Sequence, residues 1–233
     1  MKAGLFLLAA VTSVTAHATW QELWVGTEDK ASTCVRTVKD NSPIAGVTDA
    51  AMACGRSPAT SSGICEVKAG SSLTVEMHQQ PGDRSCSNPA IGGNHYGPVM
   101  VYMAKVSDAK TADGSQASFF KVAEDGYTGT TASWGTEILN ANCGKRAFTG
   151  TIRLPRSNTS GNPRLTIYKS LPASHPGTTW SEPKQLPSTL AQETLNPGVK
   201  FPGAYKTSDA LFSTAIYDAN FKYTSVGPAV YTG

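Results

Sequence analysis

Residues 72–78 read Ser-Leu-Thr-Val-Glu-Met-His, and this stretch decides the fold class. Apolar residues at 73, 75 and 77 alternate with polar ones at 74, 76 and 78, which is the period-two pattern of a strand with one buried face. Similar short apolar runs lie at 23–25 and 99–103, separated by turn residues, and only residues 134–142 suit a short helix. The sequence therefore predicts an all-β fold, an immunoglobulin-like antiparallel β-sandwich with long loops.

The N-terminus has the parts of a secretory signal peptide. A basic Met1-Lys2 start precedes an apolar run over 4–14, and Val14-Thr15-Ala16 offers a cleavage site. That run is too short to cross a bilayer, and no later stretch approaches about 20 apolar residues. We expect residues 1–16 to be a signal peptide and residues 17–233 to be one secreted, extracellular domain. Ala16-His17-Ala18 also matches a cleavage pattern, and cleavage there would remove His17.

The charge excludes some partners. Residues 1–16 contain one of the 20 basic residues and none of the 17 acidic ones, so removing them changes the net charge from +3 to +2. No Lys/Arg cluster suggests nucleic acid, and no basic amphipathic stretch suggests a membrane surface. A nearly neutral secreted protein suits an uncharged partner such as a polysaccharide.

Residues 151–196 differ from the rest of the chain. They contain six of its 14 prolines, and only residues 165–168 look like a strand. One interpretation is an inserted surface loop or linker. The other is that this stretch replaces part of the fold and disrupts the sandwich there.

His17 would be the first residue of the mature chain, and it then offers its α-amine and a ring nitrogen to one metal ion. Amines and imidazoles release their protons to a metal near neutral pH. A second imidazole completes three nitrogens, a donor set that favours Cu(II) in tetragonal geometry. His95 is the candidate, because a glycine-rich turn at 92–97 leads it into the strand-like run from 99. The simpler interpretation is that His17 is an incidental residue beside the cleavage site.

The remaining histidines and acidic pairs are weaker candidates. We expect His78, within the alternating strand, to be structural or on the surface, and His175 to be solvated. Glu28-Asp29 and Glu124-Asp125 suggest glycosidase carboxylates, but neighbouring residues on a strand point to opposite faces. Turn or surface roles are therefore expected for both pairs.

Several short sequence motifs, in their order along the chain, resemble those of auxiliary activity family nine lytic polysaccharide monooxygenases, formerly glycoside hydrolase family sixty-one. They match over about 17–149 and 198–231, and they include HATWQELWV at 17–25, QPGDRSC at 80–86, GNHYGPV at 93–99 and FPGAY at 201–205. Further motifs of this kind are FKVAE at 120–124, WGT at 134–136 and GPAV at 227–230.

The resemblance implies a copper-dependent monooxygenase with one copper ion per chain. His17 and His95 would be both the metal ligands and the catalytic residues, and Tyr205 would bind substrate on a flat face. The family uses an external electron donor and O2 or H2O2 to oxidise C1 or C4 of cellulose or another β-1,4-glucan. We expect a monomer.

The departure from the family lies in residues 151–196. The family has there an arginine-containing strand that leads to a histidine beside the copper ligands, followed by a glutamine two residues before an axial tyrosine, and a cysteine. Tyr168, His175 and Gln185 have suitable types but the wrong neighbours. Either divergence or an exon or reading-frame change would explain the stretch.

The cysteines agree with this departure. The chain has five, an odd number for an oxidising compartment. In the family the counterpart of Cys54 pairs with a cysteine of the lost strand, so the resemblance implies bridges Cys34–Cys65 and Cys86–Cys143 and an unpaired Cys54. An alternative function follows, a copper- or glycan-binding derivative of the family with impaired or no turnover.

Overall fold

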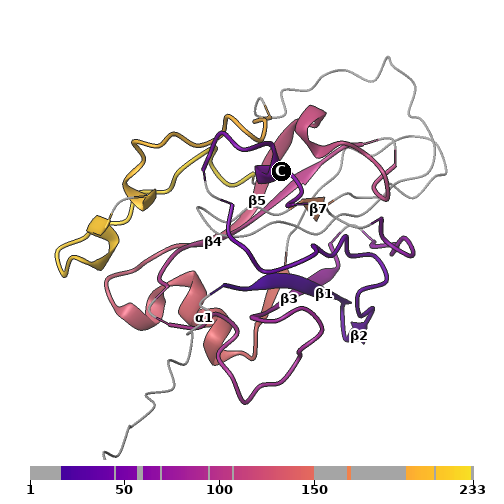
Figure 1. Ribbon diagram of the computed structural model, residues 1–233, viewed down its shortest axis with the longest axis horizontal. Coiled ribbons are helices and arrows are strands. Elements are labelled where there is room, and N and C mark those ends of the chain that lie inside the picture. Colours follow the sequence, from indigo (N-terminus) through magenta and orange to yellow (C-terminus); the bar gives the residue numbers. More distant parts are fainter. Residues whose placement is uncertain are drawn as a thin grey trace, which may run out of the picture.

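Two antiparallel sheets pack face to face in the computed structural model (Figure 1). It describes residues 17–44, 46–56, 60–68, 70–93, 95–106, 108–149, 167–168, 198–212 and 214–231. The first sheet has the order β2-β1-β3-β6 and the second the order β5-β4-β7. The predicted antiparallel β-sandwich is thus confirmed.

The first sheet is built around the alternating stretch at residues 72–78. Strand β3 (Ser72–His78) lies between β1 (Thr19–Val25) and β6 (Lys145–Thr149), and the short β2 (Glu28–Asp29) pairs with the other edge of β1. Thr19 lies opposite His78, and a bulge interrupts the β1–β3 ladder between Trp20 and Glu22. The start of β1 therefore lies beside the end of β3.

The second sheet is centred on a strand that is buried on both faces. All six residues of β4 (Val99–Ala104) are buried, between β5 (Phe119–Asp125) and β7 (Ile167–Tyr168). Val99, Val101 and Met103 face the core between the sheets. Met100 and Tyr102 pack against the C-terminal segment instead, so a continuous apolar run was needed here in place of alternation.

The core between the sheets contains the alternating residues that the pattern predicted. Met77 is 0 % exposed, and Val75 and Leu73 are also buried. Trp20 and Leu23 meet them from β1. Burying side chains of this size contributes about 1.5–3 kcal/mol each, which makes this core the main stabiliser of the sandwich.

Short helices and bridges secure the loops. The helix expected at 134–142 is present as α1 (Gly135–Ala141). Single-turn 3-10 helices are η1 (Ala50–Met52), η2 (Gly114–Gln116), η3 (Thr131–Ser133), η4 (Ala210–Phe212) and η5 (Thr214–Tyr217). The implied disulfides Cys34–Cys65 and Cys86–Cys143 are confirmed, and Cys54 is a free, buried thiol.

The signal peptide expected at 1–16 lies outside the described residues, and so does most of 151–196. Within that second stretch, Ile167 and Tyr168 pair with Met103 and Tyr102 of β4. The strand expected at 165–168 is therefore confirmed for two residues, and this part of the atypical stretch joins the second sheet. Among the described residues, no helix is long and apolar enough to cross a membrane.

Candidate metal centre

His17 lies two residues before β1, at the edge of the first sheet. Its neighbour Ala18 is fully buried and Thr19 begins the pairing with β3, so the backbone here is anchored from the first described residues onward. The His17 side chain is only partly buried. Anchored backbone and accessible ring are the arrangement that a ligand residue needs.

His95 reaches the same edge from the other sheet. It lies four residues before β4, and its side chain is exposed. Two hydrogen bonds fasten the chain beside it to α1: Gly97 N donates to Thr136 Oγ1 at 3.2 Å, and Thr136 N donates to Gly97 O at 3.1 Å. The two sheets thus bring residues 78 positions apart in sequence to one end of the sandwich.

The two rings stand close enough to share one ion. Their centroids are 6.2 Å apart, with 63° between the ring planes. A metal about 2.0–2.1 Å from one nitrogen of each ring would separate the centroids by about 6 Å if it lay between them. Within the described part of the chain, no group of three or more His, Cys, Asp and Glu side chains could hold a metal. The third donor expected here, the His17 α-amine, is not such a side chain.

The loop between β3 and β4, which carries His95, is fastened at several points. Gln21 is buried; its Nε2 donates to Gln80 O at 2.7 Å, and its Oε1 accepts from Gly82 N at 2.6 Å. The Cys86–Cys143 bridge ties the middle of the loop to the end of α1. These fastenings hold the loop against the first sheet.

His78 is structural, as predicted. It is 3 % exposed, and its Nε2 lies 2.9 Å from Glu76 Oε1. The same carboxylate accepts two hydrogen bonds from Arg84, at 2.8 and 2.7 Å, and one from Trp24 Nε1 at 2.8 Å. Burial alone would raise the pKa of Glu76, but these hydrogen bonds outweigh it and lower the pKa to about 2.

Tyr205 is buried and does not lie on the surface, where the substrate-binding role expected for it would need its ring. Its side chain is 4 % exposed, and its hydroxyl shares a 2.7 Å hydrogen bond with that of Tyr102. Such a ring cannot stack on a sugar, because it is already packed in the cluster beneath β4. Among the described Phe, Trp and Tyr side chains, the exposed one is Tyr217, at 53 %, with its ring centroid 5.7 Å from that of Tyr96.

Glu28 and Asp29 lie on the surface, as predicted. Glu124 and Asp125 end strand β5 and are partly buried, so the turn or surface role expected for that pair is wrong. Glu28 pairs with a neighbouring lysine, and Asp29 accepts from a turn amide and pairs with Arg84. Glu124 receives the hydroxyls of Tyr223 and a serine of the C-terminal segment. Asp125 forms an ion pair with an arginine of β6. Neither pair lies free for acid and base catalysis.

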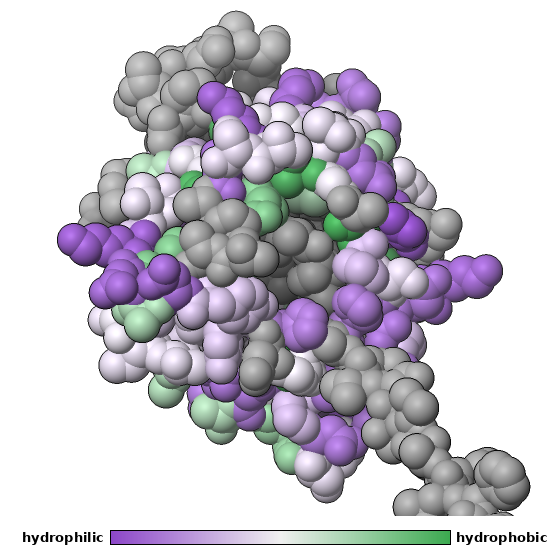
Figure 2. Space-filling view, turned by 60° about the vertical axis from the view of Figure 1, so that its left-hand side comes forward, coloured by the Kyte–Doolittle hydropathy of each residue, from purple (hydrophilic) through white to green (hydrophobic). Residues whose placement is uncertain are grey.

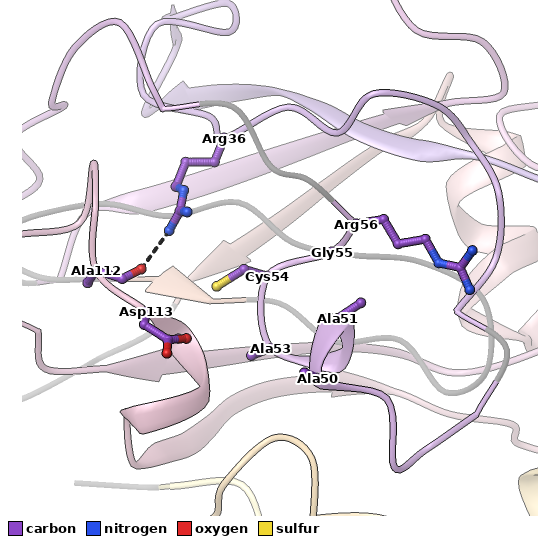
Figure 3. Close-up of a pocket in the computed structure, with 10 residues that line it drawn as sticks. Arg36, Ala50, Ala51, Ala53, Cys54, Gly55, Arg56, Ala112 and Asp113 are labelled. Carbon is purple, nitrogen blue, oxygen red and sulfur yellow. Dashed lines mark hydrogen bonds between the residues drawn. The ribbon is translucent and has the colours of Figure 1, made fainter.

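A pocket elsewhere surrounds Cys54. Figure 3 shows its thiol pointing toward the space between Arg36 and Asp113, where Arg36 Nη1 donates to Ala112 O at 2.8 Å. Burial raises the pKa of the thiol, so it stays protonated and weakly nucleophilic. The pocket is therefore not a second reactive centre.

Of the other expected residues, His175 and Gln185 lie outside the described residues. Two residues of this region were not predicted from the sequence: Asn41, whose Nδ2 donates to His17 O, and Tyr217. Neither belongs to a local pattern. Tyr217 stands in a short apolar run, and Asn41 in a turn that is 24 residues from His17.

Comparison with known proteins identifies the family of this chain. The model of Auxiliary Activity family 9 (formerly GH61) matches residues 10–162. An AA9 family lytic polysaccharide monooxygenase of Trametes coccinea is 45% identical over 224 residues, covering 94% of this chain and 80% of that protein. Another, from Botryotinia fuckeliana, is 44% identical and covers 97% and 96%.

Solved structures share the fold. CvAA9A aligns with a TM-score of 0.70 at 22% identity, over 92% of this chain and 98% of that one. HiLPMO9B aligns with a TM-score of 0.61 at 26% identity, over 93% and 100%. A family model over most of the chain and relatives above 40% identity leave one conclusion: the chain belongs to Auxiliary Activity family 9 and is a polysaccharide monooxygenase.

Proposed function

We propose that this chain is a secreted, copper-dependent monooxygenase that cleaves cellulose or a related β-1,4-glucan by oxidising C1 or C4. One observation carries the proposal: the rings of His17 and His95 meet at 6.2 Å where β1 and β4 begin. Removal of residues 1–16 would add the His17 α-amine and complete a set of three nitrogens. Such a set favours Cu(II) over metals that prefer oxygen donors or a tetrahedron.

Copper bound there would supply one-electron chemistry, with an external electron donor and O2 or H2O2 as co-reactants. The chain's own residues provide position and access. His17 and His95 hold the ion, and both rings reach solvent at least in part. A flat polymer can therefore approach the pair without entering a deep cleft.

Tyr217 is the aromatic residue that we propose for stacking on the sugar rings, in place of Tyr205. It is 53 % exposed and packs beside Tyr96, the residue that follows His95. An exposed aromatic ring near the metal ligands would place a glucan chain across them. Figure 2 shows a face on which polar and apolar residues interleave, which suits an uncharged polymer.

The test combines processing with product analysis. The N-terminus of the secreted protein is sequenced and its intact mass is measured by mass spectrometry. The protein is then incubated with swollen cellulose, copper and ascorbate. We expect a chain that begins at His17 and releases oxidised oligosaccharides, whose elution in anion-exchange chromatography distinguishes C1 from C4 products. The His95→Ala variant should release none. Oxidised products at the same level from His95→Ala would contradict the proposal.

The second candidate is a binding protein with impaired turnover, and Cys54 favours it. This thiol is unpaired and buried, and residues 151–196 contain no cysteine that could serve as the partner the family resemblance implies. A missing bridge typically costs about 2–4 kcal/mol, and missing groups around the ligands weaken a metal site. One copper per chain and binding to cellulose without oxidised products would identify this candidate.

A further inference from the structure

Two side-chain amides connect the segments that carry the histidines. Asn41 Nδ2 donates to Gln79 O at 2.7 Å and to His17 O at 3.3 Å. An amide NH2 group has two hydrogens, so one side chain can serve both carbonyls. Asn41 therefore ties the backbone of His17 to the residue that follows β3.

Gln79 continues the connection toward His95. Its Nε2 donates to Pro89 O at 2.7 Å, across the loop between β3 and β4. Its side chain also lies against Gly92: a Cβ built on Gly92 would come within 2.9 Å of Gln79 Oε1. Gly92 stands three residues before His95, so the Gln79 side chain supports the loop just where it turns toward that ligand.

The far side of this loop is fixed independently. Ile91 N donates to Asn140 Oδ1 of α1 at 2.8 Å, and Gly97 is bonded to Thr136 at the start of the same helix. The loop is thus held between α1 on one side and Gln79 on the other.

We propose that Asn41 and Gln79 together form a positioning bracket that sets the distance between His17 and His95. A metal site binds its ion well only when the metal–ligand distances lie within about 0.2 Å of their ideal values. The residues that support the ligands decide whether that precision is reached. Both amides donate to backbone carbonyls of the segments that carry the ligands, so both residues act through those segments. The inference rests on the proposed copper function.

The test uses isosteric variants. Asn41→Asp and Gln79→Glu keep size but replace the donor NH2 with an oxygen that faces the carbonyls of His17, Gln79 and Pro89. Each should weaken copper binding about 10–100-fold, measured by calorimetry. Each should also change the copper electron paramagnetic resonance spectrum at saturating copper, which a merely destabilised but intact site would not do.

Controls carry the same chemical changes at exposed positions. Asn220→Asp and Gln116→Glu add the same charge, and both side chains are exposed. They should leave affinity and spectrum unchanged. Melting temperatures of all metal-free proteins show whether each variant folds. If Asn41→Asp or Gln79→Glu does not fold, Asn41→Ala and Gln79→Ala remove the donors without adding charge.

The double variant tests whether the two residues act as one unit. Gln79→Ala keeps the backbone carbonyl that accepts from Asn41. Because both side chains act on the spacing of the same two ligands, the losses in Asn41→Ala and Gln79→Ala should be clearly non-additive. Wild-type protein that binds copper, together with bracket variants that bind it equally well with the same spectrum, overturns this inference alone. Wild-type protein that begins at His17 and binds no copper overturns the proposed function and the inference with it.

Discussion

Replacing Glu76 by Gln would remove the charge around which the outer face of the first sheet is organised. The carboxylate is buried, it accepts hydrogen bonds from Trp24 and Arg84, and it is hydrogen-bonded to His78. A Gln side chain has the same size, but its NH2 group would meet donors where an oxygen accepted. The Arg84 guanidinium would lose its closest partner.

The magnitude follows from the pKa. Burial raises the pKa of Glu76, and the hydrogen bonds lower it by more, from an ordinary 4.5 to about 2. At about 1.36 kcal/mol per pH unit, this drop corresponds to about 3 kcal/mol of folding free energy. Because the pKa is lower in the folded state, that stability is fully present above pH 4.5 and is lost as the pH falls toward 2.

Urea unfolding followed by tryptophan fluorescence measures the effect. At pH 7, Glu76→Gln should lower the free energy of unfolding by about 3 kcal/mol, and at pH 3 the difference from wild type should be less than half of that. Glu28→Gln is the matched control: it alters an exposed ion pair and should change stability by less than about 0.5 kcal/mol. A loss below about 1 kcal/mol at pH 7, or an equal loss at pH 3, would refute the reasoning.

Three further outcomes are expected. Tyr217→Ala should weaken cellulose binding about threefold to tenfold in pull-down assays. Tyr205→Phe should leave cellulose binding unchanged and lower the free energy of unfolding in urea by about 1 kcal/mol. Equal losses of binding in both variants would contradict this. Cys54 should react with iodoacetamide at pH 8 at least about tenfold more slowly in folded than in unfolded protein, because burial raises its pKa; rapid labelling of folded protein would contradict its burial. Gly144→Ala should cost about 2 kcal/mol or more in urea unfolding, because its φ is +75° and a Cβ would lie 2.0 Å from Met77 O; a neutral result would show that the turn relaxes.

Features set by local pattern could be predicted from the sequence. The alternation at 73, 75 and 77 identified a strand whose apolar side chains do enter the core. The motifs that resemble the family implied both disulfides and the free Cys54, and the structure contains them. Periodicity and motifs depend on residues that are close together in the sequence, so the sequence alone is enough to predict them.

Features set by distant contacts could not. Glu76 and His78 belong to the polar side of the alternation, yet both are buried. Arg84 of the following loop folds back onto Glu76, and Glu76 is hydrogen-bonded to His78. Tyr205 belongs to the FPGAY motif at 201–205 that resembles the family, but a sequence motif does not show the direction in which a side chain points. Asn41 meets His17 only after β1 and β3 have paired, so nothing near it in sequence marks its role.

The central claim is that the amine and imidazole of His17 and the imidazole of His95 hold one copper ion. Electron paramagnetic resonance of the copper-loaded protein, on a sample whose sequenced N-terminus is His17, tests it most directly. The account predicts one copper per chain coupled to three nitrogens, with one coupling lost in His95→Ala. A spectrum that His95→Ala leaves unchanged, or folded protein that starts at His17 and gives no bound-copper signal, would contradict it.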